Sequence, residues 1–399
     1  MYSVVNKTNI MKKQIITIAL CIPMWMQAQS IDHVLQCIEQ NNKELQSVLQ
    51  LTKAQKMENR TENNLSDPTL SYSSFYRNGG GTGHGTEFVA SQGFDFPTQY
   101  ITRNRQADLA NEALDLQQQA TRRDILLQAK NLCLDLVLLN KEKALMDIRK
   151  QNADELETLY AKRLEAGDAN ILEVNKIKME RMNVQTEVAQ NNASHRNALQ
   201  SLLAMNGNLP LEFSETNYPQ VKEIMDYNTL RDEVMASDKN LQALDFAKRA
   251  SDKQVSVNKQ NWLPKLEAGF RRNTESGISM NGFVVGGSIP LFSNRKKVQI
   301  AKAQAISAQL MQEDAKLEVE NSLMALFNEM QQLKEAMNSY DVPLMYKSLD
   351  LLKQALKEGQ ISLIEYFVEA ESVYKNLQAH MQLENQYQKV MADIYKNEL

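Results

Sequence analysis

The chain has 399 residues, of which 43% are hydrophobic, and a formal charge of −4. Its glycines (14) and prolines (8) are few for this length, a composition typical of long helices rather than of a loop-rich enzyme. The nearly balanced charge leaves no basic face, which argues against nucleic-acid binding.

The N-terminus has the pattern of an export signal. Met11-Lys12-Lys13 is a short basic segment, an apolar stretch over 15–26 follows, and Ala28 is a small residue suited to the cleavage point. We therefore predict a signal peptide over residues 1–28, in which 1–10 would be an upstream extension if translation starts at Met11. No later apolar run reaches the ~20 residues of a spanning helix. The mature chain is then either soluble or crosses a membrane as β-strands.

After the signal, a helical pattern ends before Pro68, because proline lacks a backbone donor and disfavours helix in the preceding residue. Between Pro68 and Pro97 large and small side chains alternate, which is the period of β-strands, around a glycine-rich loop at 79–85. A long helical pattern then runs to Gly167, a residue typical of helix C-caps. The expected elements are a helix over 30–63, a β-hairpin over 69–96, a long helix over 98–166 and a return helix over 168–204.

The chain then repeats itself. Pro264 follows Pro68 by 196 positions (264 − 68), and Gly359 follows Gly167 by 192 (359 − 167). So long a period indicates one duplicated supersecondary unit rather than a solenoid. The first repeat covers 29–204, a linker with two prolines covers 205–228, and the second repeat covers 229–399. The expected elements of the second repeat are a helix over 229–262, a β-hairpin over 265–290, a long helix over 294–358 and a return helix over 361–397.

Helix lengths constrain the architecture. At 1.5 Å per residue each long helix spans roughly 100 Å, whereas a return helix covers about half of that. A return helix and an opening helix stacked end to end match one long helix, with the linker at mid-height. Leu132, Leu136 and Leu139 follow the spacing of a coiled-coil seam. We therefore predict a mainly α fold of long antiparallel coiled-coil helices.

The four strands form a smaller β part. Each has about 9–11 residues, enough to cross a bilayer at a tilt, and large apolar groups alternate with small or polar ones. Four strands cannot close a barrel, and an open edge is not tolerated in lipid. The chain should therefore oligomerise, either as a dimer with eight strands or as a trimer with twelve.

This constellation resembles the TolC-like outer membrane efflux protein family over essentially the whole mature chain. The resemblance implies a homotrimer in the outer membrane of a Gram-negative bacterium. Its three chains would share a twelve-stranded transmembrane β-barrel, in contact with outer-membrane lipid, that continues into a periplasmic α-barrel.

The resemblance also assigns residues. The periplasmic tips would dock a periplasmic adaptor, which links the tunnel to an inner-membrane pump such as an RND transporter. The tip residues are Arg163, Leu164, Gly167, Leu356 and Gly359. The acidic residues of a closed entrance would be Glu173, Glu365 and Glu369, although they could equally be solvated helix charges. The helix-to-strand junctions are Pro68, Pro97, Pro264 and Pro290.

No catalytic constellation is found. His33, His84, His195 and His380 are isolated, without metal-ligand spacing or a nucleophile beside them. The methionines fall on helical seams, which favours core packing over a conduit for soft metal ions. Cys37 and Cys133 are expected to be buried thiols. We therefore predict no enzyme activity, no cofactor and no metal site.

The resulting hypothesis is a passive exit duct of a tripartite efflux system for small molecules. One alternative keeps the fold and exports proteins by type I secretion. Another, of a different class, is a periplasmic coiled-coil adaptor or scaffold, which should carry one helical hairpin flanked by compact β-domains. The sequence leaves the cargo open.

Overall fold

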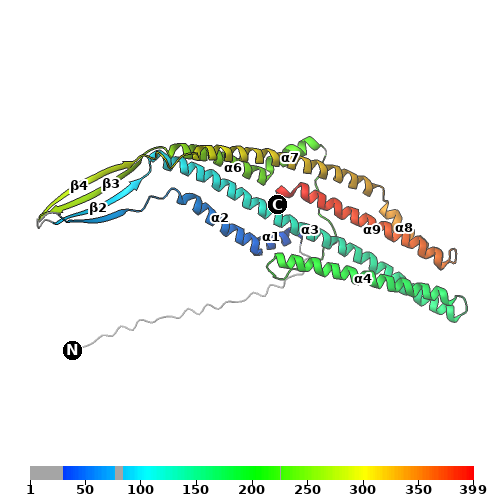
Figure 1. Cartoon of the computed structure of the whole chain (residues 1–399). Helices are drawn as coiled ribbons and strands as arrows, with labels where there is room; N and C mark the ends of the chain where they lie inside the picture. The colour runs from blue at the N-terminus through cyan, green and yellow to red at the C-terminus, as the bar shows by residue number, and fades with distance from the viewer. Residues whose placement is uncertain (1–29, 77–83, 225) are drawn as a thin grey trace, which may run out of the picture.

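The computed structural model describes residues 30–76, 84–224 and 226–399. The predicted signal peptide and most of the glycine-rich loop lie outside these residues. The molecule is elongated, with a β-sheet at one end and two helical hairpins at the other (Figure 1). The described residues are mainly helical and contain four strands, which confirms the predicted fold class of the chain.

The two repeats have the same order of elements. The first contains α1 (Ile31–Asn41), α2 (Lys43–Thr61), β1 (Thr69–Tyr76), β2 (His84–Phe94), α3 (Pro97–Glu165) and α4 (Ile171–Met205). The second contains α5 (Tyr227–Ser237), α6 (Lys239–Gln260), β3 (Lys265–Glu275), β4 (Ile278–Ser288), α7 (Lys297–Asn338), α8 (Val342–Lys357), α9 (Leu363–Ile394) and a short 3-10 helix, η1 (Lys396–Glu398).

Both opening helices, predicted as continuous, are broken, so that prediction was wrong. The breaks are at Asn42 and Asp238, which are 196 positions apart (238 − 42). Each has an extended backbone, and its side chain accepts the N–H of the residue three positions on, Leu45 or Leu241. Asn and Asp favour such N-caps over helix interiors because their short side chains bond to the backbone nearby.

The second long helix, predicted over 294–358, is also broken. It stops at Asn338, and α8 begins at Val342 with Asp341 as its N-cap and Pro343 in its first turn. Proline cannot donate the backbone hydrogen bond that a continuous helix requires, so the chain restarts there. In contrast, α3 runs without interruption through the whole helical part (Figure 1).

The sheet joins the two repeats. All neighbouring strands are antiparallel in the order β1-β2-β3-β4, and the central pair, β2 with β3, comes from different repeats. His84 and Gly85, predicted in the loop, belong to β2, where they pair with Tyr76 and Phe75. Cross-strand bonds thus extend the first hairpin two residues further than the glycine-rich pattern indicated.

The helices pack in the arrangement that their lengths require. The long α3 contacts α2 and α4 of its own repeat and α6 and α9 of the other, and α7 contacts α6 and α9. Hydrophobic clusters form where α1 covers α3 and where α5 covers α7, and a third lies among α3, α4, α8 and α9 towards the tips.

Polar side chains hold the mid-height joints between half-length helices. In the first repeat the Asn42 side chain donates to the carbonyl of Met205, the last residue of α4, at 2.9 Å. At the joint of the second repeat, Arg123 reaches across from α3 of the first repeat. It contacts Asp238 at 3.2 Å and donates to the side chain of Asn397 at 2.9 Å. The side chains of Arg123 and Asp238 are only 5% and 4% exposed. One joint is therefore made by an amide and the other by a buried ion pair.

The buried pair gives a stability prediction. Replacing Arg123 by Leu leaves the Asp238 carboxylate buried without its cation, which should lower the free energy of unfolding by about 3–5 kcal/mol. Arg123→Leu combined with Asp238→Asn should recover most of this loss, because an asparagine serves the matching joint. Denaturant titration of the purified protein measures both. The control is Arg122→Leu, which removes a partly exposed pair with Glu39 and should cost at most about 1 kcal/mol. Equal costs for the two arginines would contradict the prediction.

Candidate functional site

The first hairpin tip is a glycine turn. Gly167 has φ +83°, a conformation that side chains with a Cβ rarely adopt, and its N–H donates to the carbonyl of Leu164. The N–H of Asp168 donates to the carbonyl of Arg163 at 2.8 Å, which completes the helix C-cap. Asn170 then caps α4 together with Glu173 in a reciprocal capping box.

The second tip repeats this geometry 192 positions later. Gly359 has φ +75° and donates to the carbonyl of Leu356, and the next N–H, of Gln360, donates to Ala355 at 2.9 Å. Ser362 and Glu365 form the capping box of α9. The repeat is therefore retained in the backbone conformation and in the caps, not only in the sequence.

The predicted docking residues have different surroundings. Gly167 and Gly359 are exposed, and Arg163 is half-buried with its guanidinium 5.3 Å from the centre of the Tyr160 ring. Leu356, however, is only 1% exposed and lies inside the cluster formed by α3, α4, α8 and α9, against which Leu164 is packed. These two leucines hold the hairpins together, whereas the arginine and the glycine turns are accessible.

The predicted entrance acids also differ. The carboxylates of Glu173 and Glu365 accept the backbone N–H of Asn170 and Ser362 at 2.8 and 2.7 Å. The hydrogen bonds with Ser362 lower the pKa of Glu365, because they stabilise the charged form. Glu369, one turn further along α9, is exposed. Two of the three acids thus have a local capping role, and an entrance role for all three stays a prediction.

An ionic network near the tips was missed by the sequence reasoning. The buried Arg149 of α3 contacts Glu180 and Glu187 of α4 at 2.9 and 2.7 Å, and its guanidinium lies 5.0 Å from the centre of the Tyr374 ring of α9. From α8, Lys353 reaches Asn152 and Glu155 of α3. The seven-residue spacing of the two α4 glutamates was the available signal, since it places both on one helix face.

The junction prolines lie at the ends of the strands. Pro68 and Pro264 immediately precede β1 and β3, and Pro97 is the first residue of α3. Pro290 differs, because a turn at 291–296 separates it from α7. Near these prolines, amide side chains donate to backbone carbonyls at the C-terminal end of α6, which have no partner within the helix. Gln99 donates to the Gln260 carbonyl at 2.8 Å, and Asn294 donates to the Asn261 carbonyl.

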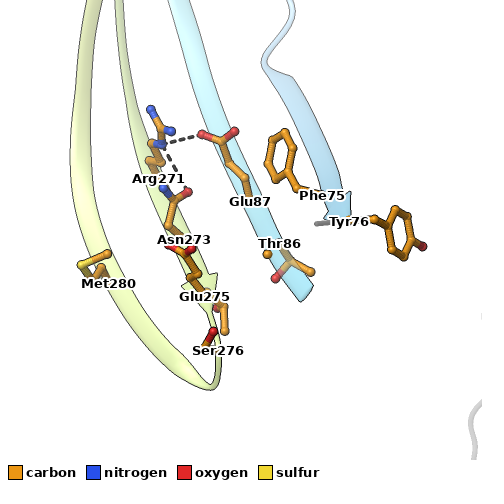
Figure 2. A pocket seen from close by; sticks show the side chains of 11 residues that line it. Phe75, Tyr76, Thr86, Glu87, Arg271, Asn273, Glu275, Ser276 and Met280 are labelled. Atoms are coloured by element: carbon orange, nitrogen blue, oxygen red, sulfur yellow. Dashed lines mark hydrogen bonds and ion pairs between the residues drawn. The ribbon is translucent and has the colours of Figure 1, made fainter. Parts of the chain in front are cut away.

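The sheet has two chemically different faces. The apolar face carries Leu70, Tyr72, Phe88, Phe94, Leu266, Phe270, Phe283 and Val285, and Phe283 is 92% exposed. The other, mainly polar face carries Ser71, Ser73, Glu87, Ser91, Glu267 and Arg271, with glycines at 85, 93, 269, 282 and 286 and with the apolar Phe75, Val89, Met280 and Val284 among them. A hollow of about 340 Å³ lies on the polar face near the hairpin ends (Figure 2). A sheet of this kind suits an apolar solvent on one side and water on the other.

Two glycines of the polar face give a matched test of the sheet. A Cβ at Gly269 would lie 2.5 Å from the Ala90 carbonyl oxygen, a distance that real Cβ atoms do not show, whereas a Cβ at Gly282 would have no atom within 4 Å. Gly269→Ala should therefore disrupt the pairing of β2 with β3, and Gly282→Ala should be tolerated. Heat-modifiable migration of the membrane fraction on gels reports the folded sheet. Normal migration of Gly269→Ala would contradict the observed strand approach.

Within the described residues, the cysteines and the possible metal ligands do not form a site. Over 30–76, 84–224 and 226–399 no group of three or more His, Cys, Asp or Glu side chains converges to hold a metal ion. Burial raises the pKa of the Cys133 thiol to about 12, whereas Cys37 is half-buried with its sulfur 3.6 Å from the ring of His33. Within the described residues no helix combines the length and the hydrophobicity needed to cross a membrane.

Comparison with known proteins agrees with this geometry. The sequence model of the outer membrane efflux protein family matches residues 230–396. No curated protein sequence matches the chain.

Several solved structures share the fold. The outer membrane protein VceC of Vibrio cholerae has a TM-score of 0.71 at 14% identity, covering 92% of this chain and 95% of its own. The CmeC outer membrane channel of Campylobacter jejuni has a TM-score of 0.69 at 14% identity, covering 93% and 85%. The MtrE outer membrane channel of Neisseria gonorrhoeae has a TM-score of 0.71 at 15% identity, covering 92% and 88%. All three are described as outer membrane proteins or channels and none as an enzyme. The chain thus shares its fold with these outer-membrane proteins, and residues 230–396 match the sequence model of the outer membrane efflux protein family.

Proposed function

We propose that the chain is one protomer of a homotrimeric exit duct in the outer membrane, through which small molecules leave the periplasm. The observation that carries this proposal is the four-stranded sheet, with one apolar and one polar face, directly continuous with helices that extend far beyond it. Such a sheet has two open edges, β1 and β4, which lipid does not tolerate. Three copies would close a barrel of twelve strands.

The tips are the proposed docking site for a periplasmic adaptor and its inner-membrane pump. The accessible part consists of Arg163 and the two glycine turns, while Leu164 and Leu356 keep the hairpins in register beneath them. Glu369, exposed beyond the capping box of α9, is the proposed entrance acid, and Glu365 and Glu173 are the further candidates. The duct itself needs no catalytic step, because the pump would supply the directionality.

The sheet bears on the periplasmic adaptor as an alternative function, whereas protein secretion differs from the proposed function only in its cargo. An adaptor should carry one helical hairpin and compact β-domains, and this chain instead pairs strands of two repeats in one sheet. That observation favours the duct. Protein secretion would use the same fold, so the cargo has to be determined by experiment.

Tip variants test the docking site. Gly359→Pro removes both the φ of +75° and the N–H that donates to Leu356, and Arg163→Glu reverses the charge beside the first turn. Either variant should leave heat-modifiable trimers in the outer membrane but abolish efflux of a fluorescent dye by the host strain. The matched control is Arg196→Glu, at an exposed position of α4 away from the tips.

Two outcomes would count against these proposals. Normal efflux with both tip variants would show that the docking site lies elsewhere. Fractionation of the wild-type protein with the periplasm rather than with the outer membrane would overturn the exit duct itself.

A further inference from the structure

Charged side chains of both signs line the polar face of the sheet. From the hairpin ends towards the helices, the strand register places them in the order Glu275, Glu87, Arg271, Glu267 and Lys265. Lys265 lies at the base of the sheet, 3.7 Å from Asp95. In the outer half of the polar face, described residues of the strands thus provide two carboxylates and one cation, Arg271.

The position of Arg271 is fixed by two neighbours. Its Nε lies 2.5 Å from a carboxylate oxygen of Glu87 on the adjacent strand and 3.3 Å from the side-chain oxygen of Asn273 (Figure 2). Both contacts use Nε, and the guanidinium has four further N–H donors on its terminal nitrogens. The Arg271 side chain is 49% exposed, whereas that of Glu87 is 19% exposed. The carboxylate therefore serves as the support and the guanidinium faces the hollow.

We propose that Arg271, held by Glu87 and Asn273, sets the charge selectivity of the exit wall and admits small molecules that carry carboxylate, phosphate or sulfonate groups. This inference rests on the proposed duct, in which the polar face would line the passage. Arginine recognises such anions in preference to other side chains because its planar fork matches their oxygens. Without it, the described strand residues in the outer half of the wall would leave Glu87 and Glu275 uncompensated, and these carboxylates would repel an anion that passes within about one Debye length (~10 Å).

The experiment measures the local potential with a reporter cysteine. Ser73→Cys places a thiol on the polar face directly across from Glu87, in a Cys37→Ser background in which Cys133 is buried. The rates of modification by an anionic and a cationic methanethiosulfonate are compared on purified trimers in detergent. Arg271→Gln should lower the anionic-to-cationic rate ratio by about fourfold, on the order of twofold for each reagent. Glu87→Gln should raise the ratio, and Arg271→Lys should keep it near the wild-type value.

The neighbouring residue provides the matched control. Arg272 lies on the apolar face, next to Phe88 in the register, so Arg272→Gln removes the same charge without altering the polar face. An unchanged ratio in Arg271→Gln, or equal changes in the two variants, would overturn the inference.

The role of Arg271 and the proposed duct can be contradicted by different experiments. The modification rates require folded trimers but no transport, so they test the role of Arg271 directly. Absence of trimers from the outer-membrane fraction of cells that express the wild-type protein would instead overturn the duct.

Discussion

The rest of the structure depends on one constraint: the backbone polar groups at the ends of the half-length helices must find hydrogen-bond partners where these helices meet. A long helix can be covered along its length by two shorter ones only if the backbone groups at their facing ends find partners. Asn42 does this by capping α2 and donating to the end of α4. Asp238 does it by capping α6 while its charge is balanced by Arg123. Beside both joints α3 continues without a break.

The two repeats agree most closely at turns and helix caps, where a specific backbone conformation is required. The two glycine turns, the two capping boxes at the tips and the two mid-height caps recur at offsets of 192 or 196 positions. The repeats differ in the continuity of their long helices, since α3 is unbroken, whereas the chain breaks between α7 and α8, just before Pro343 in the first turn of α8. The second hairpin is consequently attached to its long helix through a break, and the first is not.

The two faces of the sheet connect the fold to the proposed function. Aromatic and aliphatic side chains predominate on one face, which also carries Arg272, whereas serines, glycines and most of the charged groups lie on the other, beside Phe75 and Met280. The close approach of β2 and β3 at Gly269 brings strands of both repeats together at the centre of the sheet. A duct would place the apolar face in lipid and the polar face towards the passage, where Arg271 and the glutamates would meet the cargo.

Several site residues were predicted from local sequence patterns, but the structure gives them a different role. Glu173 and Glu365 were identified by their distance from the tip glycines, and the same distance makes them the third residue of a helix, where a carboxylate reaches back to the cap. Leu356 was assigned to an accessible tip, but burial against three other helices removes it from the surface. Arg149 and Arg123 were not singled out, because Glu180, Glu187 and the buried Asp238 lie far from them in sequence, and only the exposed Asp124 is adjacent to Arg123.

The sequence by itself determined the duplication, the four strands, the junction prolines and the glycine turns. These depend on interactions within a few residues: the missing N–H of proline, the positive φ of glycine and the two-residue period of a strand. The three helix breaks also have local causes, namely the caps Asn42 and Asp238 and the combination of Asp341 with Pro343. They were not predicted because the apolar pattern of a helix continues across each break. Only the tertiary structure decided which charges are buried as pairs and which stay exposed. The physical reason is that Asp238, the buried partner of Arg123, the acids that contact Arg149, and the α3 and α4 side chains of the cluster around Leu356 are distant in sequence from the residues that they contact.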